Sequence, residues 1–322
     1  MNRVIKNLVF EGTGVRNSIY VGGLLALDEA GLFSGVRAFA GTSSGSIVAT
    51  LAAIGYTPEE IERATLGLDF SKLLDGSAAG GFTRLLTGYG WFKGDYFLER
   101  IQELVEKKTG NPRISFAECK RRGYHDLRIV GTNVTKRLVR VFPDEGSEGM
   151  AIADAVRISM AIPLFFSSRR FQGDVYVDGG VMWNYPIGVF DELGVVNDET
   201  LGFHVESSAL PHTNHTFTPH DYFAGLFGCL VRQQEADLDN RPLDRARTVS
   251  VADQGVLVTD FSIGVEKKQL LMAAGRNATR AYLAERASIP VPAFAPGNST
   301  LPPASATTLK RQADARAVGG MS

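Results

Sequence analysis

Residues 36–55 read VRAFAGTSSGSIVATLAAIG, and they are the main evidence for the fold class. Val36–Ala40 is a short, mostly apolar run with the composition of a strand. Ser46–Ile54 is almost wholly apolar and rich in small residues, which predicts a helix buried on several sides. A tight turn from Gly41 to Gly45 joins the two. Repeated changes between strand-like and helix-like periodicity along the chain predict an α/β architecture.

The turn carries the pattern G-x-S-x-G with Ser43 at its centre. In this pattern a serine on a strained strand-to-helix turn exposes its hydroxyl group, and Gly41 and Gly45 keep side chains away from it. The helix that follows directs its N-terminal amides toward developing negative charge. The bare pattern is weak evidence in a chain with 35 glycines, but its place between a strand and a buried helix predicts a nucleophile. The alternative is a structural glycine-rich turn.

A second glycine-containing turn follows the first predicted strand, Val4–Phe10, and precedes a predicted helix. It departs from the dinucleotide-binding pattern G-x-G-x-x-G because Asn17 stands at the third glycine. We therefore expect its backbone amides to form an oxyanion hole beside Ser43, with a plain turn as the alternative. Arg16 is expected to orient this loop or to bind an anionic head group. The predicted oxyanion loop comprises Gly12, Thr13, Gly14, Val15 and Arg16.

A serine nucleophile needs a proton acceptor, and Asp178 is the best-placed candidate. It ends the predicted strand Val175–Val177, and Gly179 and Gly180 clear space directly after it. A carboxylate has a pKa of about 3.9, so it is a weak base for serine unless burial raises that pKa. Taken alone, D-G-G is also the composition of an ordinary turn. A Ser-Asp-His triad stays open, although none of the histidines lies in a recognisable motif; they are His125, His204, His212, His215 and His220.

Composition narrows the class of protein. The 34 Lys and Arg residues balance 35 Asp and Glu residues, which argues against a nucleic-acid partner. We find neither an apolar run long enough to span a bilayer nor a signal-peptide pattern, so the expected location is cytoplasmic, with peripheral membrane contact as an option. Cys119 and Cys229 give no disulfide framework or zinc spacing and are expected to be reduced core thiols.

The remaining sequence predicts one domain over residues 1–287, followed by a flexible Pro-, Ala- and Ser-rich tail over residues 288–322. Residues 76–94 mix six glycines with large apolar side chains, which suggests a loop over an apolar site or an ordinary connection. A helical stripe comprises Phe223, Leu226, Phe227, Leu230 and Val231. Core packing is its expected role, with a membrane or partner face as the alternative. Further strands are predicted at Leu127–Val134, Leu138–Phe142 and Leu201–Val205, and a helix at Ile152–Ala161.

In this order, the blocks of the chain resemble the patatin-like phospholipase family. The similarity covers the glycine loop (Leu8–Arg16), the serine turn, the segment Ala155–Phe166, the D-G-G turn and the strand that starts at Thr200. It implies a three-layer α/β/α fold with a mostly parallel central sheet. It also implies a Ser-Asp dyad, with Ser43 as nucleophile and Asp178 as base, and an oxyanion region at Gly12, Gly14 and Val15. No metal or other cofactor is implied.

Two positions depart from the family pattern. Thr13 replaces one of three consecutive glycines, and Asn17 replaces the glycine after the basic residue. A threonine restricts φ and adds bulk, so a narrower oxyanion hole or a reduced activity is expected.

The expected function is a serine acyl hydrolase that cleaves ester bonds of phospholipids, lysophospholipids or other membrane-derived lipids. The alternatives are a Ser-His-Asp esterase of smaller substrates, an acyltransferase that differs only in its acceptor, and a lipid- or nucleotide-binding homologue without activity.

Overall fold

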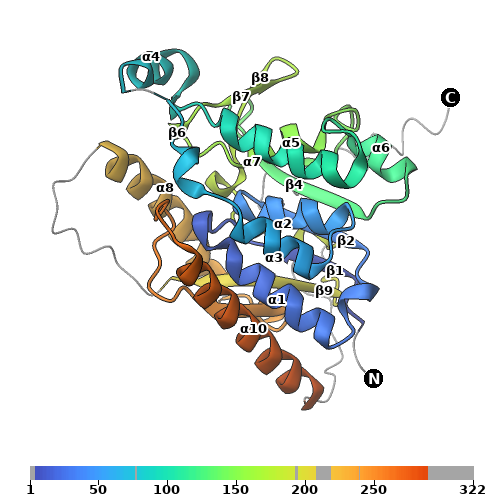
Figure 1. The fold of residues 1–322 in the computed structure, drawn as a ribbon. Coiled ribbons are helices and arrows are strands. Elements are labelled where there is room, and N and C mark those ends of the chain that lie inside the picture. Colours follow the sequence, from blue (N-terminus) through green and yellow to red (C-terminus); the bar gives the residue numbers. More distant parts are fainter. Residues whose placement is uncertain (1–3, 77, 193–194, 208–218, 239, 289–322) are drawn as a thin grey trace.

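The computed structural model describes residues 4–76, 78–192, 195–207, 219–238 and 240–288. An eight-stranded sheet forms its centre (Figure 1). The strand order is β10-β9-β1-β2-β4-β8-β7, and β5 pairs with β4 outside this path. Almost all of the tail that is expected to be flexible lies outside the described residues.

Five consecutive strands of the sheet run parallel to one another. They are β1 (Asn7–Phe10), β2 (Ala38–Thr42), β4 (Asp126–Asn133), β9 (Thr200–Glu206) and β10 (Thr248–Ala252). The antiparallel strands are β5 (Leu138–Phe142), β7 (Arg169–Phe171) and β8 (Asp174–Asp178). A mostly parallel sheet gathers the carboxyl ends of its strands at one edge, where ligands of α/β proteins bind.

The register of β4 with its two neighbours positions the candidate site. Thr42, the last residue of β2, pairs with Val130 of β4. On the other side of β4, Asp178 at the end of β8 pairs with Gly131, the residue that follows Val130. Ser43, which follows Thr42, and Asp178 are therefore level with each other along β4, on its two opposite sides.

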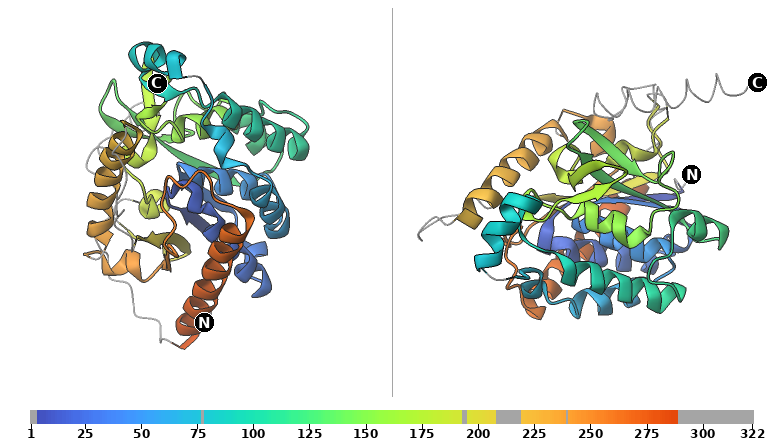
Figure 2. Two further views of the ribbon diagram at one scale, coloured as in Figure 1. Left: turned by 60° about the vertical axis from the view of Figure 1, so that its left-hand side comes forward. Right: turned by 90° about the horizontal axis from the view of Figure 1, so that it is seen from above.

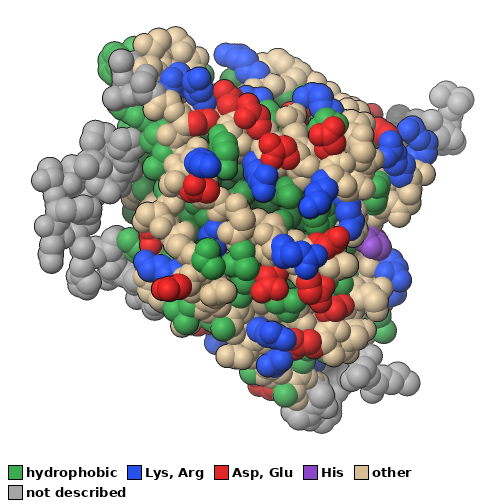
Figure 3. All heavy atoms as spheres, viewed as in Figure 1, with side chains coloured by type: hydrophobic (Ala, Val, Ile, Leu, Met, Phe, Trp, Pro, Cys, Tyr) green, Lys and Arg blue, Asp and Glu red, His purple; other side chains and the backbone are tan. Residues whose placement is uncertain are grey.

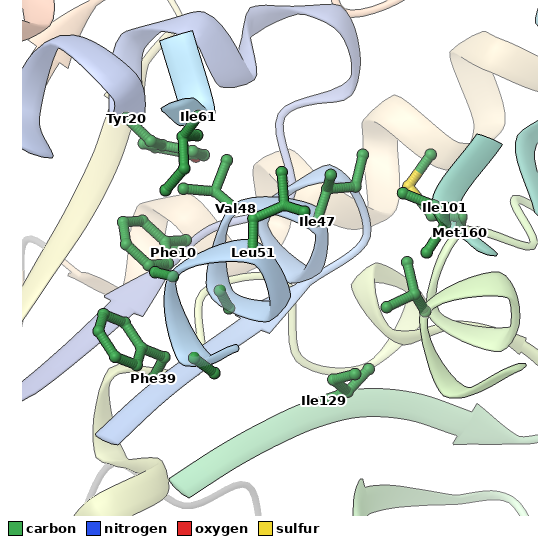
Figure 4. Close-up of a cluster of buried hydrophobic side chains, with 14 of the residues drawn as sticks. Phe10, Tyr20, Phe39, Ile47, Val48, Leu51, Ile61, Ile101, Ile129 and Met160 are labelled. Atoms are coloured by element: carbon green, nitrogen blue, oxygen red, sulfur yellow. The ribbon is translucent and has the colours of Figure 1, made fainter. Parts of the chain in front are cut away.

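Helices cover one face of this sheet (Figures 1 and 2). Next to it lie α1 (Ser18–Glu29), α2 (Ser44–Ala53), α7 (Ile152–Ser159) and α10 (Val265–Ser288), and further out lie α3 (Pro58–Leu66), α5 (Asp95–Thr109) and α6 (Phe116–Arg121). Helices α1 and α10 pack closely, and Gly275 makes this possible because it has no side chain. A Cβ atom at this position would lie 2.0 Å from the Ile19 carbonyl oxygen. Figure 4 shows the core between α2 and the sheet, where Phe10 and Phe39 meet Leu51.

The opposite face is covered by the segment that follows β8. It contains the 3-10 helices η4 (Gly179–Val181) and η5 (Ile187–Phe190), and its Trp183 joins Val9 and Val130 in a second apolar cluster. Two further helices, α8 (Pro219–Leu238) and α9 (Pro242–Arg245), follow β9. A mixed sheet with helical cover confirms the expected α/β class.

Residues 76–94 are not the loop that their glycines suggested. They form α4 (Ala78–Gly88) and the strand β3 (Gly90–Phe92), which pairs with β6 (Leu164–Phe166). A glycine is needed at position 81 because the ring of Trp91 packs against it. A Cβ atom on Gly81 would lie 2.6 Å from that ring. Phe82 and Leu86 follow one another at helical spacing, which is the sequence signal for this helix that the glycines obscured.

Two expectations about α8 are only partly met. Phe227 of its stripe packs against the core as expected, but Leu226 and Leu230 are 45% and 47% exposed. Cys119 is buried as expected, whereas Cys229 on α8 is exposed, and both thiols are free. Periodicity alone identifies an apolar face without identifying what covers it.

Candidate active site

Ser43 lies on a strained turn between β2 and α2. Its φ and ψ are 50° and −128°, values that a residue with a side chain rarely adopts. The turn is too tight for side chains on either flank. A Cβ atom on Gly41 would lie 2.5 Å from the carbonyl carbon of Gly45, and one on Gly45 would lie 2.4 Å from the carbonyl oxygen of Glu11. Glycines at both positions therefore allow β1, β2 and α2 to approach one another at the serine.

The hydroxyl group of Ser43 donates a hydrogen bond to Asp178. Ser43 Oγ lies 2.7 Å from Asp178 Oδ2, and the two residues are 4% and 0% exposed. The other carboxylate oxygen accepts a 2.7 Å hydrogen bond from the Gly180 amide. Gly179 must lack a side chain because its Cβ atom would lie 2.4 Å from the Val130 carbonyl oxygen. The glycines after Asp178 thus let residues 178–181, here called the aspartate loop, fold tightly over β4.

Burial changes the acidity of Asp178. Removal from water raises the pKa of this carboxyl group from 3.8 to about 7, while the hydrogen bonds from Ser43 and Gly180 oppose the rise. A carboxylate with a pKa near neutrality is a far better proton acceptor than an exposed one. The environment therefore supplies the basicity that the residue type lacks.

Ser159, at the end of α7, fixes the backbone of the turn. Its Oγ accepts a 2.8 Å hydrogen bond from the Ser43 amide and donates a 2.6 Å hydrogen bond to the Val130 carbonyl. The next residue, Met160, brings its Sδ atom to 3.9 Å from Ser43 Oγ. Sequence reasoning included Ser159 in a resembling block without assigning it a role, because nothing local links it to a residue 116 positions away.

Four amides of the glycine loop are already bound inside the protein. Their acceptors lie on Asn184 for Gly12, on Ser44 for Thr13, on Val258 for Val15 and on Thr13 for Arg16. Within the described part of the chain, the amide of Gly14 is the one of the five without an acceptor. Gly14 has a φ of +59°, and its Cβ atom would lie 2.3 Å from the Val258 carbonyl oxygen.

Thr13, the departure from the family pattern, is accommodated by a serine hydroxyl. Its amide donates a 3.1 Å hydrogen bond to Ser44 Oγ, and its own Oγ1 lies 3.5 Å from the same atom. Its side chain is therefore packed against the start of α2.

Arg16 holds the glycine loop from inside the protein. Its Nη1 lies 3.3 Å from Asp253 Oδ2, and the two side chains are 3% and 2% exposed. Its Nε donates a 3.4 Å hydrogen bond to the Thr13 carbonyl, and Nη1 donates to Ser207 Oγ at 3.1 Å. Of the two roles expected for Arg16, this geometry fits the orientation of the loop, because the guanidinium group is not presented to solvent.

Asn184, which the sequence analysis did not predict, links the glycine loop to the segment that follows Asp178. Its Nδ2 donates to the Glu11 carboxylate at 3.1 Å and to the Gly12 carbonyl at 3.0 Å. Its backbone amide donates to Gln234 Oε1 at 2.8 Å, and Gln234 Nε2 donates to the Gly180 carbonyl at 2.9 Å. One asparagine and one glutamine therefore connect the glycine loop, the aspartate loop and α8.

The described histidines do not complete a triad. His204 Nδ1 lies 2.9 Å from Glu11 Oε2, and His125 is half-buried beside Phe39. Among described residues, neither Ser43 nor Asp178 has a hydrogen bond to a histidine. His212, His215 and the side chain of His220 lie outside the described part of the structure. Within that part, no group of three or more His, Cys, Asp or Glu side chains is arranged to hold a metal ion.

Comparison with protein families adds a decisive observation. The family model for patatin-like phospholipase matches residues 8–191, which include the glycine loop, the serine turn and the aspartate loop. The chain belongs to the patatin-like phospholipase family. Helix α8, strand β10 and helix α10 lie beyond the matched region.

Sequence relatives of this patatin-like protein occur in viruses and bacteria. Protein R571 of Acanthamoeba polyphaga mimivirus is 28% identical over 84% of this chain and 91% of its own length. YqhO of Bacillus subtilis is 28% identical over 85% of this chain and 97% of its own length. The probable lipid hydrolase 463L of Invertebrate iridescent virus 6 is 30% identical over 57% of this chain and 62% of its own length.

Solved structures share the fold. VipD from Legionella pneumophila superposes with a TM-score of 0.63 at 18% identity, over 88% of this chain and 67% of that one. ExoU from Pseudomonas aeruginosa gives a TM-score of 0.52 at 18% identity, over 89% of this chain and 53% of that one. Family membership supports lipid hydrolase activity in general. None of the described helices has the length and apolar character needed to cross a bilayer.

Proposed function

We propose that this patatin-like protein is a serine acyl hydrolase that cleaves carboxylic ester bonds of phospholipids or lysophospholipids through a Ser43–Asp178 dyad. The observation that carries the proposal is the 2.7 Å hydrogen bond from the Ser43 hydroxyl to a fully buried carboxylate whose pKa is raised to about 7. A nucleophile on a strained turn and a base at the right distance and acidity are what a two-residue acyl-transfer site requires.

In the first half of the reaction, Asp178 Oδ2 takes the proton of Ser43 Oγ as that oxygen attacks the ester carbonyl carbon. The carbonyl oxygen becomes an oxyanion, and the Gly14 amide is the donor proposed to hold it. Gly12, Thr13, Val15 and Arg16 keep Gly14 in place through their own hydrogen bonds. The bond to the leaving alcohol then breaks, and the alcohol takes the proton from Asp178.

In the second half, water replaces the alcohol. Asp178 takes a proton from the water as its oxygen attacks the acyl-serine carbonyl carbon. The bond between that carbon and Ser43 Oγ breaks, Ser43 regains its proton from Asp178, and the fatty acid leaves. The apolar side chains of Met160, beside Ser43, and Phe227, beside Gly180, are the contacts that we propose for an acyl chain.

A fluorophosphonate probe together with hydrolysis of a lipid panel tests this proposal. We expect covalent labelling of the native protein, loss of labelling in Ser43→Ala, and a fall in turnover of about 10²–10⁴-fold in Asp178→Asn. Asp126→Asn is the matched control because Asp126 is an exposed carboxylate at the start of β4. Absence of labelling in the native protein would favour a lipid-binding homologue without activity.

The same assay separates the dyad from a triad. A Ser-His-Asp esterase would lose turnover when one of His204, His212, His215 or His220 is replaced by glutamine, whereas the dyad tolerates each of these changes. Products released in the presence of an added alcohol would distinguish a hydrolase from an acyltransferase.

A further inference from the structure

The side-chain oxygen of Asn184 is a buried acceptor whose hydrogen-bonding capacity the fold does not use. Asn184 is 1% exposed, and its Oδ1 accepts no hydrogen bond from the described residues. Charge marks no comparable feature on the face drawn in Figure 3, where acidic and basic side chains are intermixed. Leaving a buried polar atom without a partner costs free energy, so its presence beside a candidate active site points to a ligand that donates to it.

Two acceptors determine which way the Asn184 amide group points. Its Nδ2 donates to the Glu11 carboxylate at 3.1 Å and to the Gly12 carbonyl at 3.0 Å. A flipped amide would place Oδ1 against these two oxygens, which are themselves acceptors. Glu11 is held in turn, because its other oxygen accepts a 2.8 Å hydrogen bond from the Val205 amide. The orientation of Oδ1 away from Glu11 is therefore fixed by the fold.

Asn184 Oδ1 lies close to both members of the dyad, with a glycine between it and each of them. A Cβ atom on Gly180 would lie 2.7 Å from Asn184 Oδ1 and 3.1 Å from Asp178 Oδ1. A Cβ atom on Gly12 would lie 2.4 Å from Asn184 Oδ1 and 3.0 Å from Ser43 Cβ. One added carbon atom would thus touch the amide oxygen together with either the base or the nucleophile. The unused acceptor therefore belongs to the active site.

The second half of the proposed reaction needs an acceptor of this kind. A water molecule has two O–H groups, and Asp178 takes the proton of one of them. The other hydrogen stays on the attacking oxygen and is buried with it, so it needs an acceptor of its own. An alcohol has a single O–H group, which the base alone satisfies, and it has carbon in place of the second hydrogen. A base with an additional acceptor beside it therefore suits water better than an alcohol.

We propose that Asn184 is a catalytic residue of the second half-reaction, in which its Oδ1 accepts a hydrogen bond from the attacking water and so selects water over alcohols as the acyl acceptor. This inference rests on the proposed function and specifies the co-substrate of the same site. The water oxygen bonds to the acyl carbon as Asp178 takes one proton, and the remaining O–H group donates to Asn184 Oδ1. The bond from that carbon to Ser43 Oγ then breaks, and Oγ takes the proton back from Asp178. The retained O–H group leaves as part of the fatty acid.

Competition between water and methanol for one acyl-enzyme tests this selection. The substrate is a short-chain nitrophenyl ester, and the readout is the ratio of methyl ester to free acid formed at a fixed methanol concentration. Both products come from the same acyl-serine, so slower acylation or a smaller folded fraction cancels in the ratio. We expect Asn184→Leu, which removes the acceptor, to raise the ratio about tenfold or more. Asn184→Ala is the second variant, with the same expected rise and without the bulk of leucine.

Asn184→Asp is the matched comparison. All three variants lose the Nδ2 hydrogen bonds to Glu11 and Gly12, but aspartate keeps an oxygen where the acceptor lies. We expect its ratio to stay within about threefold of the native value, whatever its turnover. A native ratio in the leucine and alanine variants, or an equal rise in all three, would overturn the role of Asn184. A native protein that forms neither product and does not react with a fluorophosphonate would overturn the proposed function instead.

Discussion

The guanidinium group of Arg16 and the carboxylate of Asp253 form a buried ion pair across 237 positions of sequence, with Nη1 and Oδ2 3.3 Å apart. Arg16 belongs to the glycine loop, whereas Asp253 follows β10 and lies beyond the region that the family model matches. Val258, from the same connection, accepts a hydrogen bond from the Val15 amide and fills the space above Gly14. The C-terminal part of the chain therefore shapes the loop that is proposed to hold the oxyanion.

The first prediction concerns this ion pair. Asp253→Asn leaves the arginine buried with a neutral partner, so the glycine loop loses orientation and we expect kcat to fall about tenfold with little change in KM. Steady-state kinetics on a soluble ester measure both constants. Asp260→Asn is the control, because Asp260 lies in the same connection and pairs with the exposed Lys267. An Asp253→Asn variant that unfolds more readily yet keeps its native kcat would contradict the positioning role.

The parts of the site that could be predicted are those formed by residues close together in the sequence. The strand, glycine turn and buried helix around Ser43 occupy twenty consecutive residues, and short-range sterics determine them. The serine, the aspartate and the glycine loop could each be proposed because each lies directly at a predicted strand end and their order resembles that of the family, although each pattern alone also fits an ordinary turn. The strands β1, β2, β4 and β9 and the helix α2 were also predicted within a few residues of their ends, whereas β10 was not predicted.

The supporting residues could not be predicted because they act across long sequence separations. Nothing near Gln234 indicates that its amide completes hydrogen bonds for a loop 54 positions earlier. The exposure of Leu226 depends on which elements cover α8, and an apolar stripe has the same sequence whether it is covered or not. Helix α4 was missed because the ring of Trp91 that packs on Gly81 could not be foreseen from the sequence.

A second prediction separates backbone strain from crowding at the candidate oxyanion donor. Gly14 and Gly31 have φ values of +59° and +68°, but a Cβ atom on Gly14 meets Val258 whereas one on Gly31 meets nothing within 4 Å. We expect Gly31→Ala to cost about 1–2 kcal/mol of unfolding free energy and to leave turnover unchanged. Gly14→Ala should displace the free amide and reduce kcat by about 10²–10³-fold. Denaturant titration and ester kinetics on both variants provide the measurements, and similar kinetics for the two would rule out a catalytic role for Gly14.

A third prediction follows from the acidity of Asp178. The carboxyl group must be ionised to accept the serine proton, and its pKa is raised to about 7. We therefore expect kcat/KM for a soluble ester to rise with pH through about 7 and to reach a plateau above it. A profile already flat at pH 5 would mean that the base has the acidity of an ordinary exposed carboxylate or that another group takes the proton.

The fourth prediction concerns stability, because the same burial opposes folding when Asp178 is charged. The unfolded chain loses this proton near pH 4, and the folded protein keeps it until about pH 7. Folding therefore takes up a proton between these values, and this group makes the native state progressively less stable as pH rises through that window. Asp178→Asn has no charge to bury, and its amide can accept the hydrogen bond from Gly180 while donating one to Ser43 Oγ. We expect the variant to be more stable than the native protein by about 2–4 kcal/mol at pH 8 and to show no such gain at pH 4. Thermal unfolding of both proteins at the two pH values measures the difference, with Asp126→Asn as the surface control, and a gain of equal size at pH 4 and pH 8 would show that the buried charge is not its cause.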